Sequence, residues 1–131
     1  MTPHSELAAQ QPVVIVVDDD PAVCNSLKFS LELEGFAVRA YPSGPELLES
    51  GDLGSCSCFV IDQRMPAMTG MELIGKLRQR QVLTPAILIL SHPNATLTAR
   101  AANADVPIVE KPLLGNALVE RIREACQRRQ A

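Results

Sequence analysis

Aromatic residues are scarce in this chain of 131 residues: they make up 3% of it, and tryptophan is absent. A core must therefore be built from aliphatic side chains, and 47% of the residues are hydrophobic, which is enough to form one. A surplus of basic residues is also lacking, since the formal net charge is −3. Because nucleic acids attract basic surfaces, this charge argues against direct nucleic-acid binding.

Long apolar runs are missing too, so the sequence predicts no membrane span, and the polar start (1–12) has no apolar signal core. Of the four cysteines only Cys56 and Cys58 are close in sequence, and no histidine lies near them. Zinc sites use paired clusters of such ligands, so zinc is not expected. These absences predict a cytoplasmic protein with reduced thiols and no contact with a membrane.

Short apolar stretches alternate with helical patterns along the rest of the chain. Val13–Val17 is a run of β-branched residues, typical of a strand buried on both faces of a parallel sheet. An aspartate cap and Pro21 then begin a helix that Gly35 ends. The same alternation predicts strands over 36–41, 58–61, 86–90 and 106–109, and helices over 46–49, 71–80, 95–103 and 113–127.

Apolar spacing predicts which side of each helix faces the core. The inward residues expected are Val23, Leu27, Leu31 and Leu33 in the first helix, Leu73, Ile74 and Leu77 in the third, and Leu114, Leu118, Ile122 and Ala125 in the last.

Strands that alternate with helices form parallel βαβ units with right-handed crossovers. Five such units predict one α/β domain over 13–128, built on a doubly wound five-stranded parallel sheet. A loose leader (1–12) would precede it and a short tail (129–131) would follow. Ligands of such sheets bind beyond the carboxyl ends of the strands.

Acids, a hydroxyl and an amine follow the predicted strands. Asp18–Asp20 come after the first strand, and Asp62 ends the third. Ser91 follows the fourth strand, and Lys111 lies just beyond the fifth. The aspartates 18–20 alone would equally fit helix capping. Packed together, however, carboxylates repel one another, and a hard cation such as Mg²⁺ relieves that repulsion. A carboxylate can also accept a phosphoryl group, whose oxygens a metal, an amine and a hydroxyl would hold.

Four segments carry these residues in a fixed order, 16–20, 59–62, 87–91 and 110–112, and a fifth segment, 65–70, lies between the second and the third. In this set the chain resembles the receiver domains of response regulators in two-component signalling, over almost its whole length after the leader. The resemblance implies a flavodoxin-like strand order of 2-1-3-4-5. It also implies a signalling phosphoacceptor that catalyses only its own phosphorylation and dephosphorylation, and so no enzyme acting on other molecules.

The resemblance further implies roles for the acidic residues. Asp62 would be the phosphoacceptor. Mg²⁺ would be bound by Asp19, by Asp62, by the backbone carbonyl of Arg64 and, partly through water, by Asp18. Asp20 would stay outside the direct ligands.

Ser91 would be the switch hydroxyl and Lys111 the amine that binds the phosphate, with a cis peptide bond before Pro112. The implied phosphodonor is a sensor histidine kinase or a phosphotransfer protein, and the downstream partner is an unknown protein. A homodimer through the face of helix four, strand five and helix five is a further expectation.

Some positions depart from the family pattern. Ile108 stands where an aromatic residue usually moves with the switch hydroxyl, and His92-Pro93 follows Ser91 where a small residue is usual. Arg64 and Pro93 favour slow self-dephosphorylation. No output domain follows the last helix, so the chain is expected to be a free-standing receiver or a fragment of a larger regulator.

Three alternatives remain at this point. The first is a receiver-shaped interaction module that does not switch, which the departure at Ile108 favours. The second is a phosphohydrolase, although Arg64 stands where such enzymes commonly carry a second acid. The third is a flavin protein, although no loop offers the phosphate cradle that a flavin needs.

Overall fold

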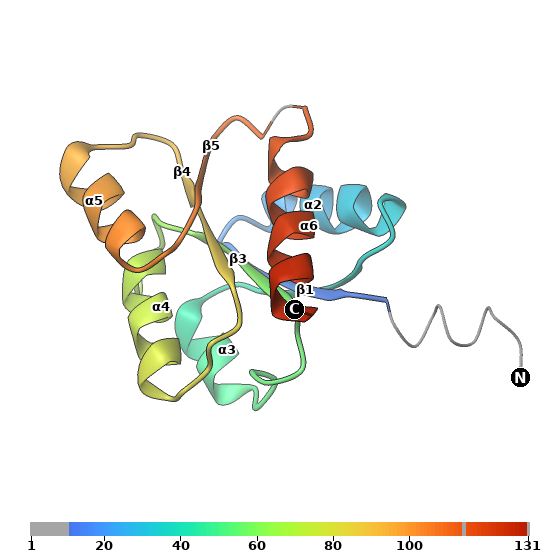
Figure 1. Cartoon of the computed structure of the whole chain (residues 1–131), viewed down its shortest axis with the longest axis horizontal. Helices are drawn as coiled ribbons and strands as arrows, with labels where there is room; N and C mark the ends of the chain where they lie inside the picture. The colour runs from blue at the N-terminus through green and yellow to red at the C-terminus, as the bar shows by residue number, and fades with distance from the viewer. Residues whose placement is uncertain (1–10, 114, 131) are drawn as a thin grey trace, which may run out of the picture.

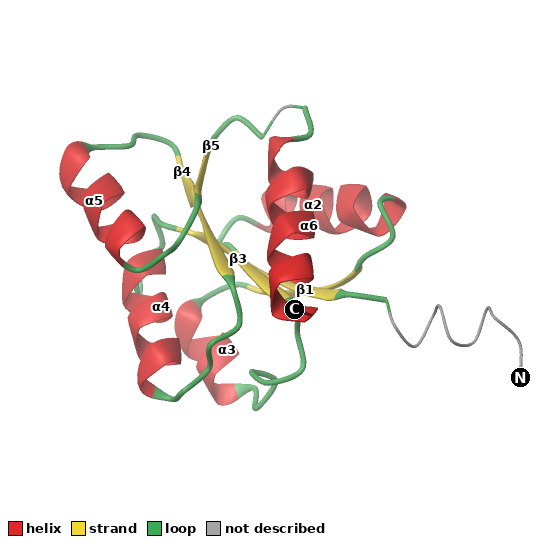
Figure 2. Cartoon of the chain, in the orientation of Figure 1, coloured by secondary structure: helices red, strands yellow, loops and turns green. Residues whose placement is uncertain are grey.

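Five parallel strands form the middle layer of the computed structural model, which describes residues 11–113 and 115–130 (Figures 1 and 2). The strands lie in the order β2-β1-β3-β4-β5. This order confirms the predicted doubly wound α/β sheet. The bounds are β1 (Val13–Val17), β2 (Ala37–Tyr41), β3 (Cys58–Asp62), β4 (Ala86–Leu90) and β5 (Ile108–Glu110).

Helices cover both faces of the sheet (Figure 1). Alternate strand residues point to opposite faces, and they form two separate core clusters. Ile15, Phe59 and Leu88 share one cluster with residues of α3 (Gly44–Glu49), α4 (Gly70–Gln79) and α5 (Ala95–Asn103). Val16, Val60 and Ile89 share the other with residues of α2 (Pro21–Leu33) and α6 (Ala117–Gln130).

Side chains cap the helix starts of α2 and α4, and the aspartate cap of α2 was predicted from the sequence. Asp20 caps α2, because its carboxylate accepts a hydrogen bond of 2.9 Å from the Ala22 N–H, and Pro21 occupies the first turn. Thr69 caps α4 in a reciprocal arrangement with Glu72. These caps set where each helix leaves the carboxyl edge of the sheet.

Leu33 is not a core residue, and this prediction was wrong. Its side chain is 72% exposed, whereas Leu27 and Leu31 of the same helix are buried. Two residues correspond to about 200° around a helix of 3.6 residues per turn, so Leu33 points away from the face that Leu31 buries. The predicted inward positions of α4 and α6 are confirmed: Leu73, Ile74, Leu77, Leu118, Ile122 and Ala125 are all buried.

The C-terminal elements differ from prediction at their ends. β5 begins at Ile108 rather than at 106, since Pro107 has no N–H to donate to the sheet. The last helix begins at Ala117 and continues to Gln130, past the predicted end of the domain at 128. Leu114 and the leader residues 1–10 lie outside the described residues.

Two expectations about composition can be compared with the structure. None of the described cysteines forms a disulfide. Among the described helices, none combines the length and apolar character that a bilayer crossing requires.

Candidate functional site

Strand register brings the predicted site residues to one edge of the sheet. Val17 of β1 pairs with Ile61 of β3, so the next residues, Asp18 and Asp62, are neighbours. Leu90 of β4 pairs with Glu110 of β5, which places Ser91 beside Lys111 in the same way. Because all five strands are parallel, these positions share the carboxyl edge.

An ammonium group and two carboxylates form the centre of the site. The Lys111 Nζ lies 3.2 Å from Asp62 Oδ1 and 3.8 Å from Asp18 Oδ2. The first distance is an ion pair at hydrogen-bond range, and the second is too long for a hydrogen bond. Lys111 therefore balances part of the negative charge, with Asp62 as its closer partner.

Both central carboxylates are buried: Asp18 is 2% exposed and Asp62 is 5% exposed. Burial raises the pKa of Asp62, the negative charge of Asp18 raises it further, and Lys111 opposes the shift. Burial also raises the pKa of Asp18, against a backbone hydrogen bond of 2.9 Å from the Asp20 N–H to Asp18 Oδ1. Additional positive charge at this place would stabilise both ionised groups.

The donor set fits a hard metal cation. Oxygens of Asp18, Asp19 and Asp62 lie within 4.8 Å of one another. Asp18 Oδ2 is buried and has no hydrogen-bond partner among the described residues, an arrangement that is costly unless something else binds that oxygen. Carboxylates of this kind are the ligands that Mg²⁺ uses in proteins. The acidic cluster is thus able to hold a cation, and Asp20, whose carboxylate caps α2, is outside it.

The remaining predicted residues line the open side of the same site. Arg64, Ser91 and Lys111 border a cavity of about 470 Å³ together with the aspartates at 18, 19, 20 and 62. Ser91 and Arg64 are exposed on the loops that follow β4 and β3. The structure therefore brings every predicted site residue to one cavity. The peptide bond between Lys111 and Pro112 is cis, as the resemblance implied.

Gln63, which the sequence did not single out, and Gly70, the last residue of the segment 65–70, hold the loop after Asp62 in place. The Gln63 side chain accepts a hydrogen bond of 2.9 Å from the Met71 N–H, and its backbone carbonyl accepts one of 3.0 Å from the Gly70 N–H. A side chain at Gly70 would meet the Asp62 carbonyl oxygen at 2.8 Å. The Gly before a helix start is visible in the sequence, but this close approach is not.

Comparison with known proteins identifies the family of the chain. The family model of the response regulator receiver domain matches residues 14–123. The chain therefore belongs to the response regulator receiver domain family.

Among curated relatives, the C4-dicarboxylate transport transcriptional regulatory protein DctR of Rhodobacter capsulatus is 32% identical over 110 residues, which cover 82% of this chain and 56% of that protein. The transcriptional regulatory protein FixJ of Rhizobium meliloti is 33% identical over 115 residues, covering 87% and 56%. The chain thus spans only about half the length of these relatives.

Solved structures show the same fold. FixJ-N superposes with a TM-score of 0.80 at 32% identity, covering 90% of this chain and 95% of that one. The chemotaxis protein CheY4 of Vibrio cholerae also gives a TM-score of 0.80, at 19% identity over 88% of this chain and 98% of that one, a likeness of fold alone.

Proposed function

We propose that this receiver domain is a phosphorylation-dependent signalling switch in which Asp62 accepts a phosphoryl group with Mg²⁺ at the acidic cluster. The observation that carries the proposal is the convergence of a buried Asp62, the Asp18 oxygen that accepts no hydrogen bond and the Lys111 ammonium within one cavity. If these residues served stability alone, one of the two acids would be enough to neutralise the charge of Lys111. A site for phosphoryl transfer needs the surplus of oxygen ligands that this cavity has.

Each protein group has a distinct part in the reaction. A carboxylate oxygen of Asp62 attacks the phosphorus of a phosphohistidine donor. A phosphorus–oxygen bond forms while the phosphorus–nitrogen bond breaks, and the leaving imidazole nitrogen keeps the electron pair. Lys111, now 3.2 Å from Asp62, would neutralise one oxygen of the transferred group, and the Ser91 hydroxyl would donate to another. A bound Mg²⁺ supplies positive charge for the phosphoryl oxygens. Arg64 would add its backbone carbonyl to the metal ligands.

The domain would act on no other substrate, so it would catalyse only its own phosphorylation and dephosphorylation. Both named relatives are transcriptional regulators by name. We propose that the phosphorylated state of this domain is read by a protein, since its net charge of −3 disfavours direct contact with DNA. Its proposed setting is the cytoplasm, where a phosphodonor kinase would present its phosphohistidine.

The proposed donor, a sensor histidine kinase or a phosphotransfer protein, would dock beside the site. A groove of about 890 Å³ runs between α2 and residues 111–113. It shares Ser91 and Lys111 with the phosphoacceptor cavity, and Phe29 on its wall is 67% exposed. An apolar groove continuous with the reacting oxygen suits a helix that carries the donor histidine.

Intact-mass measurement tests the proposed reaction. The protein is incubated with acetyl phosphate and Mg²⁺, and we expect a mass increase of one phosphoryl group that EDTA prevents. Asp62→Asn should give no adduct, while Asp52→Asn, an aspartate outside the cavity, should react as the wild type does. An adduct that survives Asp62→Asn, or no adduct at all with Mg²⁺ present, would overturn the proposal.

A second candidate, a receiver-shaped interaction module that does not switch, is favoured by one observation. Ile108 on β5 is half-buried against the core cluster that Leu97 of α5 also joins, so no aromatic ring is available to move inward. NMR spectra with beryllofluoride and Mg²⁺ distinguish the two functions. Shifts limited to the phosphoacceptor cavity favour the module, whereas shifts along β4, β5 and α5 support the switch. Sedimentation of the same samples tests the expected homodimer through the α5–β5–α6 face.

A further inference from the structure

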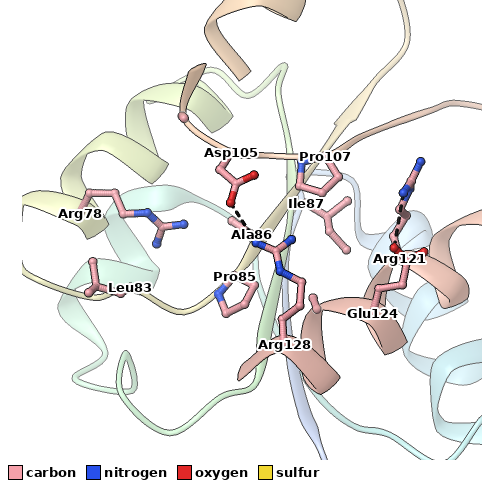
Figure 3. A pocket seen from close by; sticks show the side chains of 12 residues that line it. Arg78, Leu83, Pro85, Ala86, Ile87, Asp105, Pro107, Arg121, Glu124 and Arg128 are labelled. Atoms are coloured by element: carbon pink, nitrogen blue, oxygen red, sulfur yellow. Dashed lines mark hydrogen bonds and ion pairs between the residues drawn. The ribbon is translucent and has the colours of Figure 1, made fainter. Parts of the chain in front are cut away.

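A second polar cavity lies at the amino ends of the strands, whereas Asp62 lies at their carboxyl ends. It has a volume of about 260 Å³ and borders Pro85, Ala86 and Pro107, where β4 and β5 begin. Figure 3 shows the Arg78 side chain reaching toward it from α4 and the Arg128 side chain from α6, with the Asp105 carboxylate between them. The proposed phosphoryl transfer uses none of these residues.

Arg78 is unusual among the arginines of this protein. It is half-buried, whereas every other arginine whose side chain the structure describes is exposed. Its Nη1 donates to the carbonyl oxygens of Val82 and Thr84 at 2.8 and 2.9 Å. No carboxylate of the described residues lies within ion-pair distance of it, and burial lowers its pKa. A half-buried cation without an anionic partner is costly, and a bound anion would offset that cost.

The other charges around the cavity are already paired. Arg128 lies 2.9 Å from Asp105, and Arg121 lies 3.6 Å from Glu124. Three guanidinium groups thus face two carboxylates, which leaves one positive charge, that of Arg78. The negative charge of Asp105 acts on Arg78, but the Asp105 carboxylate already accepts a hydrogen bond from Arg128.

We propose that this cavity binds a small oxyanion, the phosphate or carboxylate group of a small metabolite, with Arg78 as its main ligand. Arg128, whose Nη2 is held by Asp105, would be the second ligand through the rest of its guanidinium group. A guanidinium group is planar and binds two oxygens of such a group at once. The volume of about 260 Å³ lies below the range of about 300–1,000 Å³ for pockets that take drug-sized ligands, which suits a compact anion. The site is independent of the phosphoacceptor function.

NMR titration of the metal-free protein tests the site, because the acidic cluster without metal repels anions. Metal is removed with EDTA, which is then dialysed away since its own carboxylates would compete. Potassium phosphate and potassium acetate are added separately, with potassium chloride at matched ionic strength as reference. Saturable shifts at Ala86, Ile87 and Asp105 with phosphate or acetate, beyond those with chloride, support the proposal, and the stronger of the two identifies the preferred oxyanion. Shifts that only follow ionic strength, or that saturate only around Lys111, overturn it.

Variants tie the binding to the two arginines. Arg78→Gln and Arg128→Gln should each weaken binding by about tenfold, which is the loss of one charge-assisted interaction. Arg100→Gln removes an exposed arginine of α5 and should leave binding unchanged. Arg78 also holds the loop before β4, so a thermal melt accompanies its variant. If Arg78→Gln fails to fold, the affinity of Arg128→Gln is the test, because Arg128 is exposed. Unchanged affinity in Arg128→Gln overturns the proposal.

Discussion

Gly70, the first residue of α4, lies against the backbone of β3 at Asp62, the proposed phosphoacceptor. A Cβ atom added there would lie 2.6 Å from Cδ1 of Leu88, 2.8 Å from the carbonyl oxygen of Asp62 and 3.1 Å from Cα of Gln63. The Leu88 methyl can rotate away, but the two backbone atoms cannot. Gly70→Ala must therefore move the start of α4 away from β3, or move Asp62 itself.

The size of the effect follows from two opposing contributions. Overpacking of a tightly packed interior costs about 1–3 kcal/mol. Alanine in place of glycine restricts the unfolded chain and favours the helix, which returns up to about 1 kcal/mol. We expect a net loss of about 1–2 kcal/mol in the free energy of unfolding, and a fall of roughly 4–8 °C in the midpoint of thermal unfolding.

Gly75→Ala is the matched control, because it makes the same change in the same helix. Gly75 is exposed, and a Cβ there would meet nothing within 4 Å. This variant should gain up to about 1 kcal/mol. Urea unfolding measures both free energies, and acetyl phosphate with Mg²⁺ measures the phosphorylation rate, which should fall in Gly70→Ala alone. Equal stabilisation of both variants with unchanged phosphorylation would refute the close-contact reasoning.

Three further predictions concern the core, the site and the groove. Leu31→Ala should cost about 2–5 kcal/mol by urea unfolding, because Leu31 is buried, whereas Leu33→Ala, at an exposed position of the same helix, should change stability by less than about 0.5 kcal/mol. Burial and the negative charge of Asp18 raise the pKa of Asp62. Asp62 therefore binds a proton more readily in the folded state than in the unfolded chain, and its ionised form opposes folding at neutral pH. Without metal, Asp62→Asn should therefore be more stable than wild type, by a margin that shrinks as pH falls toward the ordinary value of 3.8; a margin that grows on acidification would contradict this sign. Phe29→Ser should slow phosphoryl transfer from an autophosphorylated histidine kinase and leave the rate with acetyl phosphate unchanged, and equal slowing of both would place Phe29 outside donor docking.

The parts of the fold that the sequence predicted rest on local chemistry. Val13–Val17 could be assigned as a central strand because five consecutive apolar residues need burial on both faces. The cap of α2 followed from Asp20 and Pro21. Leu33 was assigned to the core because it is apolar and near Leu31, although only the angle around the helix decides which side is buried. The start of β5 was similarly misplaced, because Val106 is buried without pairing in the sheet.

The site has two parts: a strand half, whose residues lie at the ends of strands, and a loop half, whose residues lie on the loops that follow them. Asp18, Asp62 and Lys111 are at strand ends, where parallel register alone brings them together, and this is why their meeting could be predicted from widely separated segments. Ser91 and Arg64 are exposed on loops, where strand register does not fix their positions. The tight packing of Gly70 against the backbone of Asp62 and Gln63, next to Arg64, is likewise encoded in no sequence pattern. In the proposed function the strand half supplies the nucleophile and the Lys111 ammonium, the loop half adds the Ser91 hydroxyl and the Arg64 carbonyl, and readout would require the loops to respond. The chemistry of this domain is therefore more predictable from its sequence than its signal, and the beryllofluoride response of β4, β5 and α5 is the measurement that separates them.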